Sequence, residues 1–187
     1  MVKNFNLSES KSLSKQCVSL GLTDFDAVYN YVRQLPYGRN SNRRNYKLIL
    51  KEKRGTCSTK HAFLKAIALE NNNEDLKLCL GIFKMNSNNT PKISGVLDTY
   101  QLDYIPEAHC YLKVGETIKD ITFNDNEKPI FIESLLHEEA ILPEQIGSYK
   151  IILHQTFLTS WIEEESVQLT FDDLWKVREL CIAQLSE

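Results

Sequence analysis

The chain has 187 residues, of which 42% are hydrophobic, 10% aromatic and 25% charged. This length is sufficient for one globular domain with a sizeable core, and the composition excludes a largely disordered or fibrous protein. The formal net charge of −3 argues against generic nucleic-acid binding, and no stretch has the length and apolar character of a membrane-spanning helix.

Two helices are predicted near the N-terminus. Residues 8–20 indicate a first helix that ends at Gly21. Thr23 has the character of an N-cap for a second helix, which begins at about Asp24 and stops before Pro36. Apolar side chains recur along this second segment at the helical period, so we expect it to bury one face.

The following segment connects these helices to the rest of the chain. Residues 36–42 have the composition of a loop. Residues 46–50 fit either a short strand or a helical turn, and the sequence leaves both interpretations open. We therefore treat residues 1–50 as the helical N-terminal part of a single domain spanning 1–187.

Cys57 opens a predicted helix that runs to about Glu70. Gly55 precedes it and permits a sharp turn or the close approach of a ligand. A thiol in the first helical turn lies near unpaired N–H groups and the positive end of the helix dipole, which favour the nucleophilic thiolate. Cys57 is therefore a candidate nucleophile. The alternative is a buried small hydrophobic residue, the role expected of Cys17 and Cys181.

Strand-like segments follow this helix. Residues 76–85 predict a half-buried strand, and residues 86–101 have the composition of an exposed loop. Residues 108–114 and 117–123 predict two strands, and the intervening Gly115-Glu116 suits a two-residue type II′ hairpin.

The C-terminal part is predicted to contain a long strand and a closing helix. Residues 149–162 are rich in β-branched and aromatic side chains and predict a strand with a bend, in which His154 is a buried histidine with a satisfied hydrogen bond. Thr170 should cap the final helix. Its expected buried face consists of Leu174, Val177, Leu180, Cys181 and Leu185. The order of elements predicts an α+β fold, with a core over 54–123 and the strand and closing helix over 124–187.

Charge is unevenly distributed along the sequence. Basic residues surround the cysteine: Arg33, Arg39, Arg43, Arg44, Lys47, Lys51, Lys53, Arg54, Lys60 and Lys65. The last fifty-odd residues are rich in acidic side chains. Either the two halves face each other across the fold, or the basic residues attract an acidic substrate and further favour the thiolate.

A thiolate nucleophile requires a general base and a group that orients the base. If Gly115 and Glu116 form the turn, Val114 pairs with Thr117, and His109 and Asp120 become diagonal neighbours on one sheet face. A register shift of one residue would separate them.

The stretches Gly55-Thr56-Cys57, Ala108-His109-Cys110-Tyr111 and Asp120-Ile121-Thr122 together resemble the transglutaminase-like superfamily. The resemblance covers residues 54–123, about a third of the chain. Members share a papain-like core in which a helix bearing the cysteine packs on an antiparallel sheet bearing the histidine and aspartate. The resemblance implies Cys57 as the nucleophile, His109 as the base and Asp120 as the orienting group.

Two positions depart from the pattern of this superfamily. Tyr111 stands where tryptophan is commoner, and Lys51-Glu52-Lys53 stands where papain-type enzymes place an oxyanion-hole glutamine. The backbone N–H of Cys57 can supply one oxyanion donor. Candidates for the second donor, which could equally be turn residues, are Tyr37, Asn40 and Asn42. Further candidates for substrate contact are Arg54, His61 and Tyr111.

Two alternatives involve other side chains near the cysteine. His61 lies one helical turn after Cys57 and is an alternative base, although packing or substrate contact is favoured. Cys57, His61, His109 and Cys110 would make a Cys₂His₂ zinc set. Cys110, however, should point to the face opposite His109, so we expect it in the core and expect no metal or other cofactor.

These observations predict a cysteine-dependent acyl-transfer enzyme that acts through a thioester and hydrolyses an amide or peptide bond. The expected substrate is a peptide or small amide, and an acidic one if the basic residues around Cys57 attract it. The alternatives are a non-catalytic protein that binds an acidic peptide or metabolite in the same basic cleft, or an acyltransferase similar to arylamine N-acetyltransferases. The N-terminus lacks the apolar core of a signal peptide, and five cysteines then fit free thiols, so a cytoplasmic location is expected.

Overall fold

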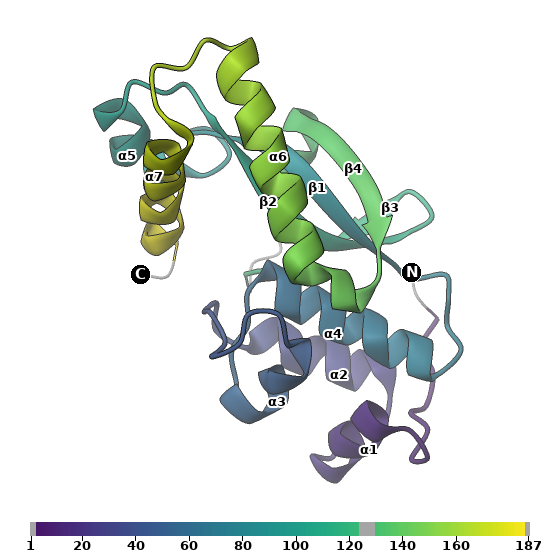
Figure 1. The fold of residues 1–187 in the computed structure, drawn as a ribbon. Helices are drawn as coiled ribbons and strands as arrows, with labels where there is room; N and C mark the ends of the chain where they lie inside the picture. Colours follow the sequence, from purple (N-terminus) through teal and green to yellow (C-terminus); the bar gives the residue numbers. More distant parts are fainter. Residues whose placement is uncertain (1–2, 124–129, 186–187) are drawn as a thin grey trace. The chain divides into compact units, whose positions relative to one another are not determined.

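The computed structural model describes residues 3–123 and 130–185. These residues form α-helices, short 3₁₀ helices and a four-stranded sheet, so the predicted α+β class is confirmed (Figure 1). The chain divides into two compact units, each assembled from three segments. Unit 1 takes its described residues from 1–80, 110–127 and 139–147, and unit 2 from 81–109, 128–138 and 148–187.

Unit 1 is built around one central helix. Its helices are α1 (Ser12–Ser19), α2 (Phe25–Gln34), α3 (Ile49–Glu52) and α4 (Cys57–Glu70). α4 packs against the other three, and Figure 1 shows it among them. Its predicted bounds are confirmed, and every residue from Cys57 to Ala68 is buried, so the helix is enclosed on all sides.

The structure identifies the N-cap of α2 and the conformation of residues 46–50. Asp24, and not Thr23, caps α2, because its carboxylate accepts a 2.9 Å hydrogen bond from the N–H of Ala27. Residues 46–50 are helical: a 3₁₀ turn over Tyr46–Leu48 continues directly into α3. A short non-helical segment, residues 53–56, then connects α3 to the cysteine helix.

The sheet has the strand order β3-β2-β1-β4. Its strands are β1 (Lys77–Met85), β2 (Ile105–Val114), β3 (Thr117–Lys119) and β4 (Leu135–Ile141). The predicted β2–β3 hairpin is confirmed, with Val114 opposite Thr117 in an antiparallel register. Gly115 adopts a φ of 55°, which a primed turn requires at its first position. β3 ends at Lys119 instead of Phe123, so Asp120 follows the strand.

β1 is more deeply buried than predicted. Only Lys77 at its start is exposed, and nearly every later residue is buried. Side chains that alternate between the two faces of a strand can all be buried only if both faces are covered. The segment is therefore an interior strand and not the half-buried one expected.

Unit 2 contains two helical segments that the sequence interpretation missed. Residues 86–101, predicted to be a loop, include a 3₁₀ turn over Pro91–Ile93 and the helix α5 (Ser94–Thr99). The strand predicted for residues 149–162 is wrong, because this segment lies in α6 (Ser148–Glu164). The buried side chains of α6 recur at steps of four and three residues, which is the helical period. They are His154, Leu158 and Trp161.

The final helix, α7 (Phe171–Gln184), begins as predicted. The Thr170 hydroxyl accepts a hydrogen bond from the N–H of Asp173. Leu174, Val177 and Cys181 are buried as expected, but Leu185 is half-buried and Leu180 is 47% exposed. Ile182, which was not expected on this face, is buried.

A buried ionic network joins α6 and α7 to β2 within unit 2. The guanidinium of Arg178 donates from two nitrogens to the Glu107 carboxylate, at 2.8 Å from Nε. Burial alone would raise the pKa of Glu107, but the charges of Arg178 and then His154 lower it to about 2. The Nε2 atom of His154 lies 2.8 Å from the carbonyl oxygen of Pro106. Its hydrogen bond is thus satisfied as predicted, although the residue lies on a helix.

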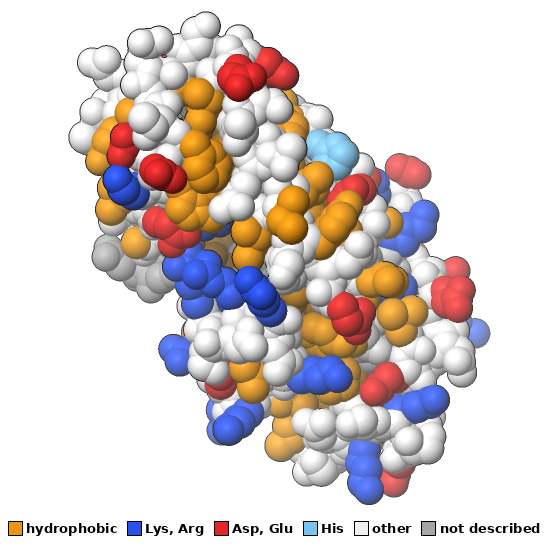
Figure 2. Space-filling view, viewed as in Figure 1, with side chains coloured by type: hydrophobic (Ala, Val, Ile, Leu, Met, Phe, Trp, Pro, Cys, Tyr) orange, Lys and Arg blue, Asp and Glu red, His pale blue; other side chains and the backbone are white. Residues whose placement is uncertain are grey.

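No helix among residues 3–123 and 130–185 is long and apolar enough to cross a membrane. Acidic and basic side chains both appear on the face shown in Figure 2, with apolar side chains between them. Two of the basic residues grouped around Cys57 in the sequence are absent from the surface. Lys60 is 0% exposed and Lys65 is 7% exposed, because α4 is enclosed on all sides.

Candidate active site

Cys57 is the first residue of α4, as the sequence predicts. The turn is stabilised by Thr59, whose hydroxyl accepts a 3.0 Å hydrogen bond from the N–H of Thr56. The Cys57 side chain is 8% exposed, and its Sγ atom lies 3.8 Å from the Ser58 hydroxyl. A thiol in this first turn experiences the positive end of the helix dipole, which favours a negative charge on sulfur.

Gly55 permits the close approach of the preceding loop to α4. A Cβ atom at this position would lie 2.9 Å from the Thr59 hydroxyl and 3.0 Å from both Ile49 Cδ1 and Lys60 Cγ. The backbone of Gly55 also donates to Pro36 and accepts from Gly38. The glycine is therefore required for packing immediately before the cysteine.

His61 links the first turn of α4 to the segment after β3. Its Nε2 atom lies 2.9 Å from the backbone nitrogen of Ile121, and its Nδ1 atom lies 2.7 Å from the carbonyl oxygen of Cys57. The N–H of Ile121 can only donate, so Nε2 is the acceptor and Nδ1 carries the proton. His61 is thus a neutral, fully buried imidazole with both ring nitrogens bonded to backbone. In this arrangement the lone pair of Nε2 is engaged by the N–H of Ile121, which argues against a role of His61 as general base.

Asp120 lies beside this imidazole, immediately after β3. Its Oδ1 atom accepts hydrogen bonds from the N–H and the hydroxyl of Thr122, at 2.9 and 2.6 Å. Its Oδ1 atom is also 3.5 Å from Nε2 of His61. The Asp120 side chain is 16% exposed. The short turn that Thr122 stabilises therefore fixes the carboxylate while leaving part of it accessible.

Lys60 is a buried cation in the same region. Its Nζ atom donates to the carbonyl oxygens of Thr122, Ile121 and Arg33 at 3.0, 3.2 and 3.4 Å. Three acceptors match the three N–H donors of an ammonium group. Burial lowers the pKa of Lys60 to about 8, while the charges of Asp120 and Cys57 act in the opposite direction.

The loop candidates for a second oxyanion donor have local structural partners. The Asn40 amide donates to Glu52 and to the carbonyl oxygen of Arg54, at 3.1 and 2.9 Å. Asn42 accepts from the N–H of Arg44 and is a turn residue, one of the two roles expected for it. Both side chains hold the loop in place in this structure.

Tyr37, Arg54 and Tyr111 differ in exposure. Tyr37 forms an isolated parallel bridge with Gly55, and its ring lies 5.2 Å from that of Phe123. Arg54 is exposed, directly before this bridge. Tyr111 is fully buried and belongs to the core of unit 1, which removes its side chain from the surface that a substrate reaches.

His109 lies on β2 within unit 2. Its ring contacts Phe131 and Phe83 edge-on, with centroid separations of 4.7 and 6.0 Å. Two aromatic neighbours restrict the orientation of the imidazole. Because Cys57 and Asp120 belong to unit 1, the pairing of His109 with either residue stays a prediction. Cys110, the next residue, is fully buried, as expected.

Lys60 and the backbone of residues 121–122 were not assigned to the site from the sequence. One sequence signal pointed to Lys60. The apolar residues Ala62, Phe63 and Leu64 are consecutive and therefore occupy different sides of the helix. A helix that is apolar on all sides is enclosed, so a lysine within it must be buried and paired. The carbonyl groups that pair with it have no sequence signal.

Within residues 3–123 and 130–185, no group of three or more His, Cys, Asp or Glu side chains is arranged to hold a metal ion. Comparison with protein-family models, curated proteins and solved structures finds no match to this chain.

Proposed function

We propose that this chain is a cysteine-dependent acyl-transfer enzyme with a transglutaminase-like, papain-like core. One observation carries the proposal: the first turn of α4, which bears Cys57, is joined to the Asp120 segment by both His61 and Lys60. The backbone of Cys57 and the turn that carries Asp120, 63 positions apart in the sequence, are thus tied to each other by hydrogen bonds, which supports their proposed use in one site. Such rigid placement of reactive groups is what covalent catalysis requires.

In the proposed reaction, the Cys57 thiolate attacks an acyl carbonyl and forms a tetrahedral intermediate. The N–H of Cys57 stabilises the oxyanion, since N–H groups in the first turn of a helix point out of its N-terminal end. His109, protonated by the thiol, returns the proton to the leaving amine as the thioester forms. It then removes a proton from water, whose attack releases the carboxylic acid and regenerates the thiol.

His109 and Asp120 have the supporting roles of base and orienting group. The β2–β3 register supports this assignment as far as the ladder extends, because Leu112 pairs with Lys119 as the predicted alignment requires. The ladder ends there, so the expected pairing of His109 with Thr122 is not part of it. The contacts of His109 with Phe83 and Phe131 support a fixed imidazole. The two bonds of His61 to backbone support His109 over His61 as the base.

The surface charge near Cys57 favours an acidic substrate. The exposed basic side chains that precede α4 include Arg39, Lys51, Lys53 and Arg54. Such charges increase the local concentration of an anionic ligand and stabilise a thiolate, and both effects weaken with added salt. We therefore propose hydrolysis of an amide or peptide bond in an acidic peptide or small acidic amide.

The experiment uses p-nitrophenyl acetate, an acyl donor whose leaving group does not need protonation. Wild-type protein should release p-nitrophenolate in a burst, and mass spectrometry should locate the acetyl group on Cys57. Cys57→Ser should abolish the burst, while Cys181→Ser, which changes a buried cysteine of unit 2, should retain it. A burst that survives Cys57→Ser, or an acetyl group located only on lysine, would contradict the proposal.

A further inference from the structure

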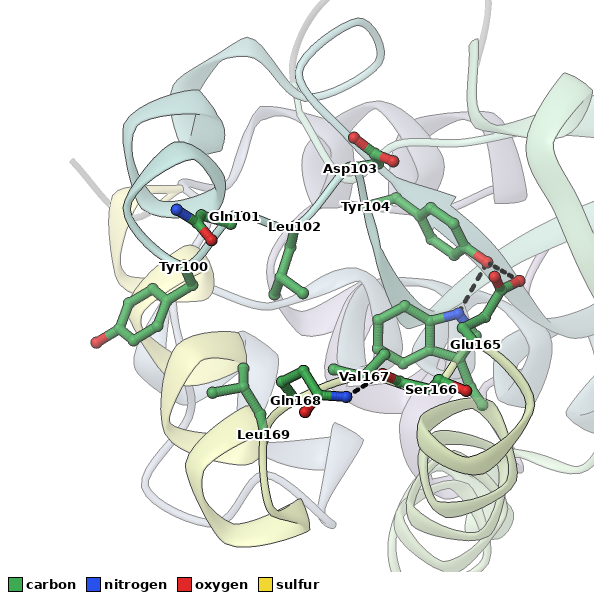
Figure 3. A pocket seen from close by; sticks show the side chains of 11 residues that line it. Tyr100, Gln101, Leu102, Asp103, Tyr104, Glu165, Ser166, Val167, Gln168 and Leu169 are labelled. Atoms are coloured by element: carbon green, nitrogen blue, oxygen red, sulfur yellow. Dashed lines mark hydrogen bonds between the residues drawn. The ribbon is translucent and has the colours of Figure 1, made fainter.

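Unit 2 contains a cavity of about 450 Å³ that the thiol chemistry does not use (Figure 3). Its walls come from the end of α5, the segment before β2, the end of α6 and the connection to α7. This volume lies within the range of small-molecule sites. The cavity can therefore accept a ligand of several non-hydrogen atoms.

One wall of the cavity is a hydrogen-bonded aromatic pair. The indole N–H of Trp161 donates to the Tyr104 hydroxyl at 2.8 Å, and this hydroxyl lies 3.2 Å from the Glu165 carboxylate. The two rings lie 5.3 Å apart at an interplanar angle of 55°. Since the Tyr104 hydroxyl accepts from Trp161, its proton points to Glu165, which fixes the carboxylate at the cavity wall (Figure 3).

The described residues that line the cavity carry negative formal charge only. Its carboxylates are Asp103 and Glu165, and none of its described lining residues is Lys or Arg. α5 and α6 end at Thr99 and Glu164, next to the lining, and their last carbonyl groups accept backbone hydrogen bonds from the segments that line the cavity. Outside the lining, the Lys84 ammonium lies 4.6 Å from the Tyr104 ring centroid, so this ring already takes part in a cation–π contact.

Two residues that line the cavity have backbone conformations that are uncommon for residues other than glycine. Gln101 and Ser166 have φ values of 54° and 53°, in the left-handed region. One precedes the Asp103 segment and the other follows Glu165. Residues held in this region are found where the surrounding structure fixes a particular shape.

We propose that this cavity binds a small organic cation, an ammonium or guanidinium ion with an apolar body. The carboxylates attract the charge, and the aromatic wall with Leu102 packs against the apolar part. The ligand is either a free amine or a basic side chain of a peptide. The proposal does not rest on the thiol chemistry, so Cys57→Ser should bind the same ligands unchanged.

The test is a titration of the full chain followed by two-dimensional NMR, with the indole N–H of Trp161 as the reporter. The only other tryptophan is Trp175, and Trp175→Phe assigns the two indole signals. Phenethylammonium should shift the Trp161 signal in a saturable way, whereas phenylacetate, of similar shape and opposite charge, should not. N-acetyl-lysine amide and N-acetyl-arginine amide, compared with phenethylammonium, distinguish a peptide side chain from a free amine.

Charge-removing variants provide the matched comparison. Glu165→Gln and Asp103→Asn should each weaken phenethylammonium binding about two- to fivefold, as expected for ion pairs at partly exposed sites. Both side chains are exposed, so the fold should be retained. Glu164→Gln removes a neighbouring charge outside the lining and should leave the affinity within about 1.5-fold of the wild-type value. Equal binding of phenylacetate, no response of Trp161, or unchanged affinity in both lining variants would overturn the proposal.

Discussion

The Nε2 atom of His61 accepts a 2.9 Å hydrogen bond from the backbone N–H of Ile121, 60 residues further along the chain. Through its Nδ1 atom the same ring is bonded to the carbonyl oxygen of Cys57. One buried side chain thus fixes the distance between the cysteine turn and the segment that carries Asp120. The conformation of this region depends on His61 even though the residue has no part in the proposed proton transfers.

His61→Leu should destabilise the protein by about 2–4 kcal/mol, because it removes both bonds and leaves the buried N–H of Ile121 without an acceptor. His61→Gln should lose less, since an amide oxygen can reach the position of Nε2. Urea unfolding of the two variants measures the difference, with the exposed substitution Lys47→Ala as a control. A loss below about 0.5 kcal/mol for His61→Leu would show that the link is unimportant.

Lys60 should make stability depend on pH in the alkaline range. Its folded pKa of about 8 lies below its ordinary value of 10.5, so the folded state releases this proton first. Between these values the unfolded state binds more protons, and stability contributed at this site rises with pH. The free energy of unfolding of the wild type, minus that of Lys60→Met, should increase by up to about 3 kcal/mol from pH 7 to pH 10.5.

Urea unfolding at several pH values tests this dependence. The same subtraction for the exposed Lys47→Met should be flat over the same range. A flat or falling difference for Lys60→Met would mean that the ammonium is not held at a lowered pKa in the folded protein.

Gly55→Ala should reduce stability by about 1–3 kcal/mol, because the added methyl group would overlap the Thr59 hydroxyl and the Ile49 side chain. Gly95→Ala is the matched comparison, since Gly95 lies in α5 with no atom within 4 Å of an added Cβ. That substitution should be stabilising by about 0.5–1 kcal/mol. Thermal unfolding of the two variants should therefore shift in opposite directions, and equal shifts would refute the packing role of Gly55.

The elements that sequence analysis predicted best were those with strong local signals. α4 begins where a glycine meets a run of helix formers, and the β2–β3 hairpin follows from two strand-like segments around Gly115. The cap of α7 by Thr170 is equally local. Each depends on residues within a few positions of one another, where propensity and turn chemistry act directly.

Residues 149–162 were predicted to form a strand because they are rich in β-branched and aromatic side chains, although the spacing of their buried residues is that of a helix. Ile151, Ile152 and Thr156 favour β-structure only weakly, whereas the spacing of His154, Leu158 and Trp161 matches one helical face. Contacts of this face with β2, such as the hydrogen bond from His154 to the carbonyl oxygen of Pro106, stabilise the helical conformation. Such tertiary contacts are not encoded at short range.

The chemistry around Cys57 was predictable only in part. The sequence predicts the cysteine at a helix start and the hairpin register near Asp120. It gives no indication that the carbonyl groups of residues 121 and 122 would pair with Lys60, because backbone atoms have no residue identity. β3 also ends earlier than predicted, because the backbone of residues 121–122 bonds to the Lys60 and His61 side chains of α4 instead of continuing the ladder with β2.

The pH dependence of iodoacetamide labelling at Cys57, with and without His109, tests the proposed catalytic role most directly. Burial raises the pKa of Cys17 and Cys181 to about 12 and 11, so these two thiols serve as unreactive internal references. Mass spectrometry of labelled peptides should show Cys57 modified rapidly below pH 7, and His109→Ala should abolish this reactivity. If Cys57 is modified as slowly as Cys17 and Cys181, or equally fast without His109, the proposed thiolate–imidazolium pair does not exist.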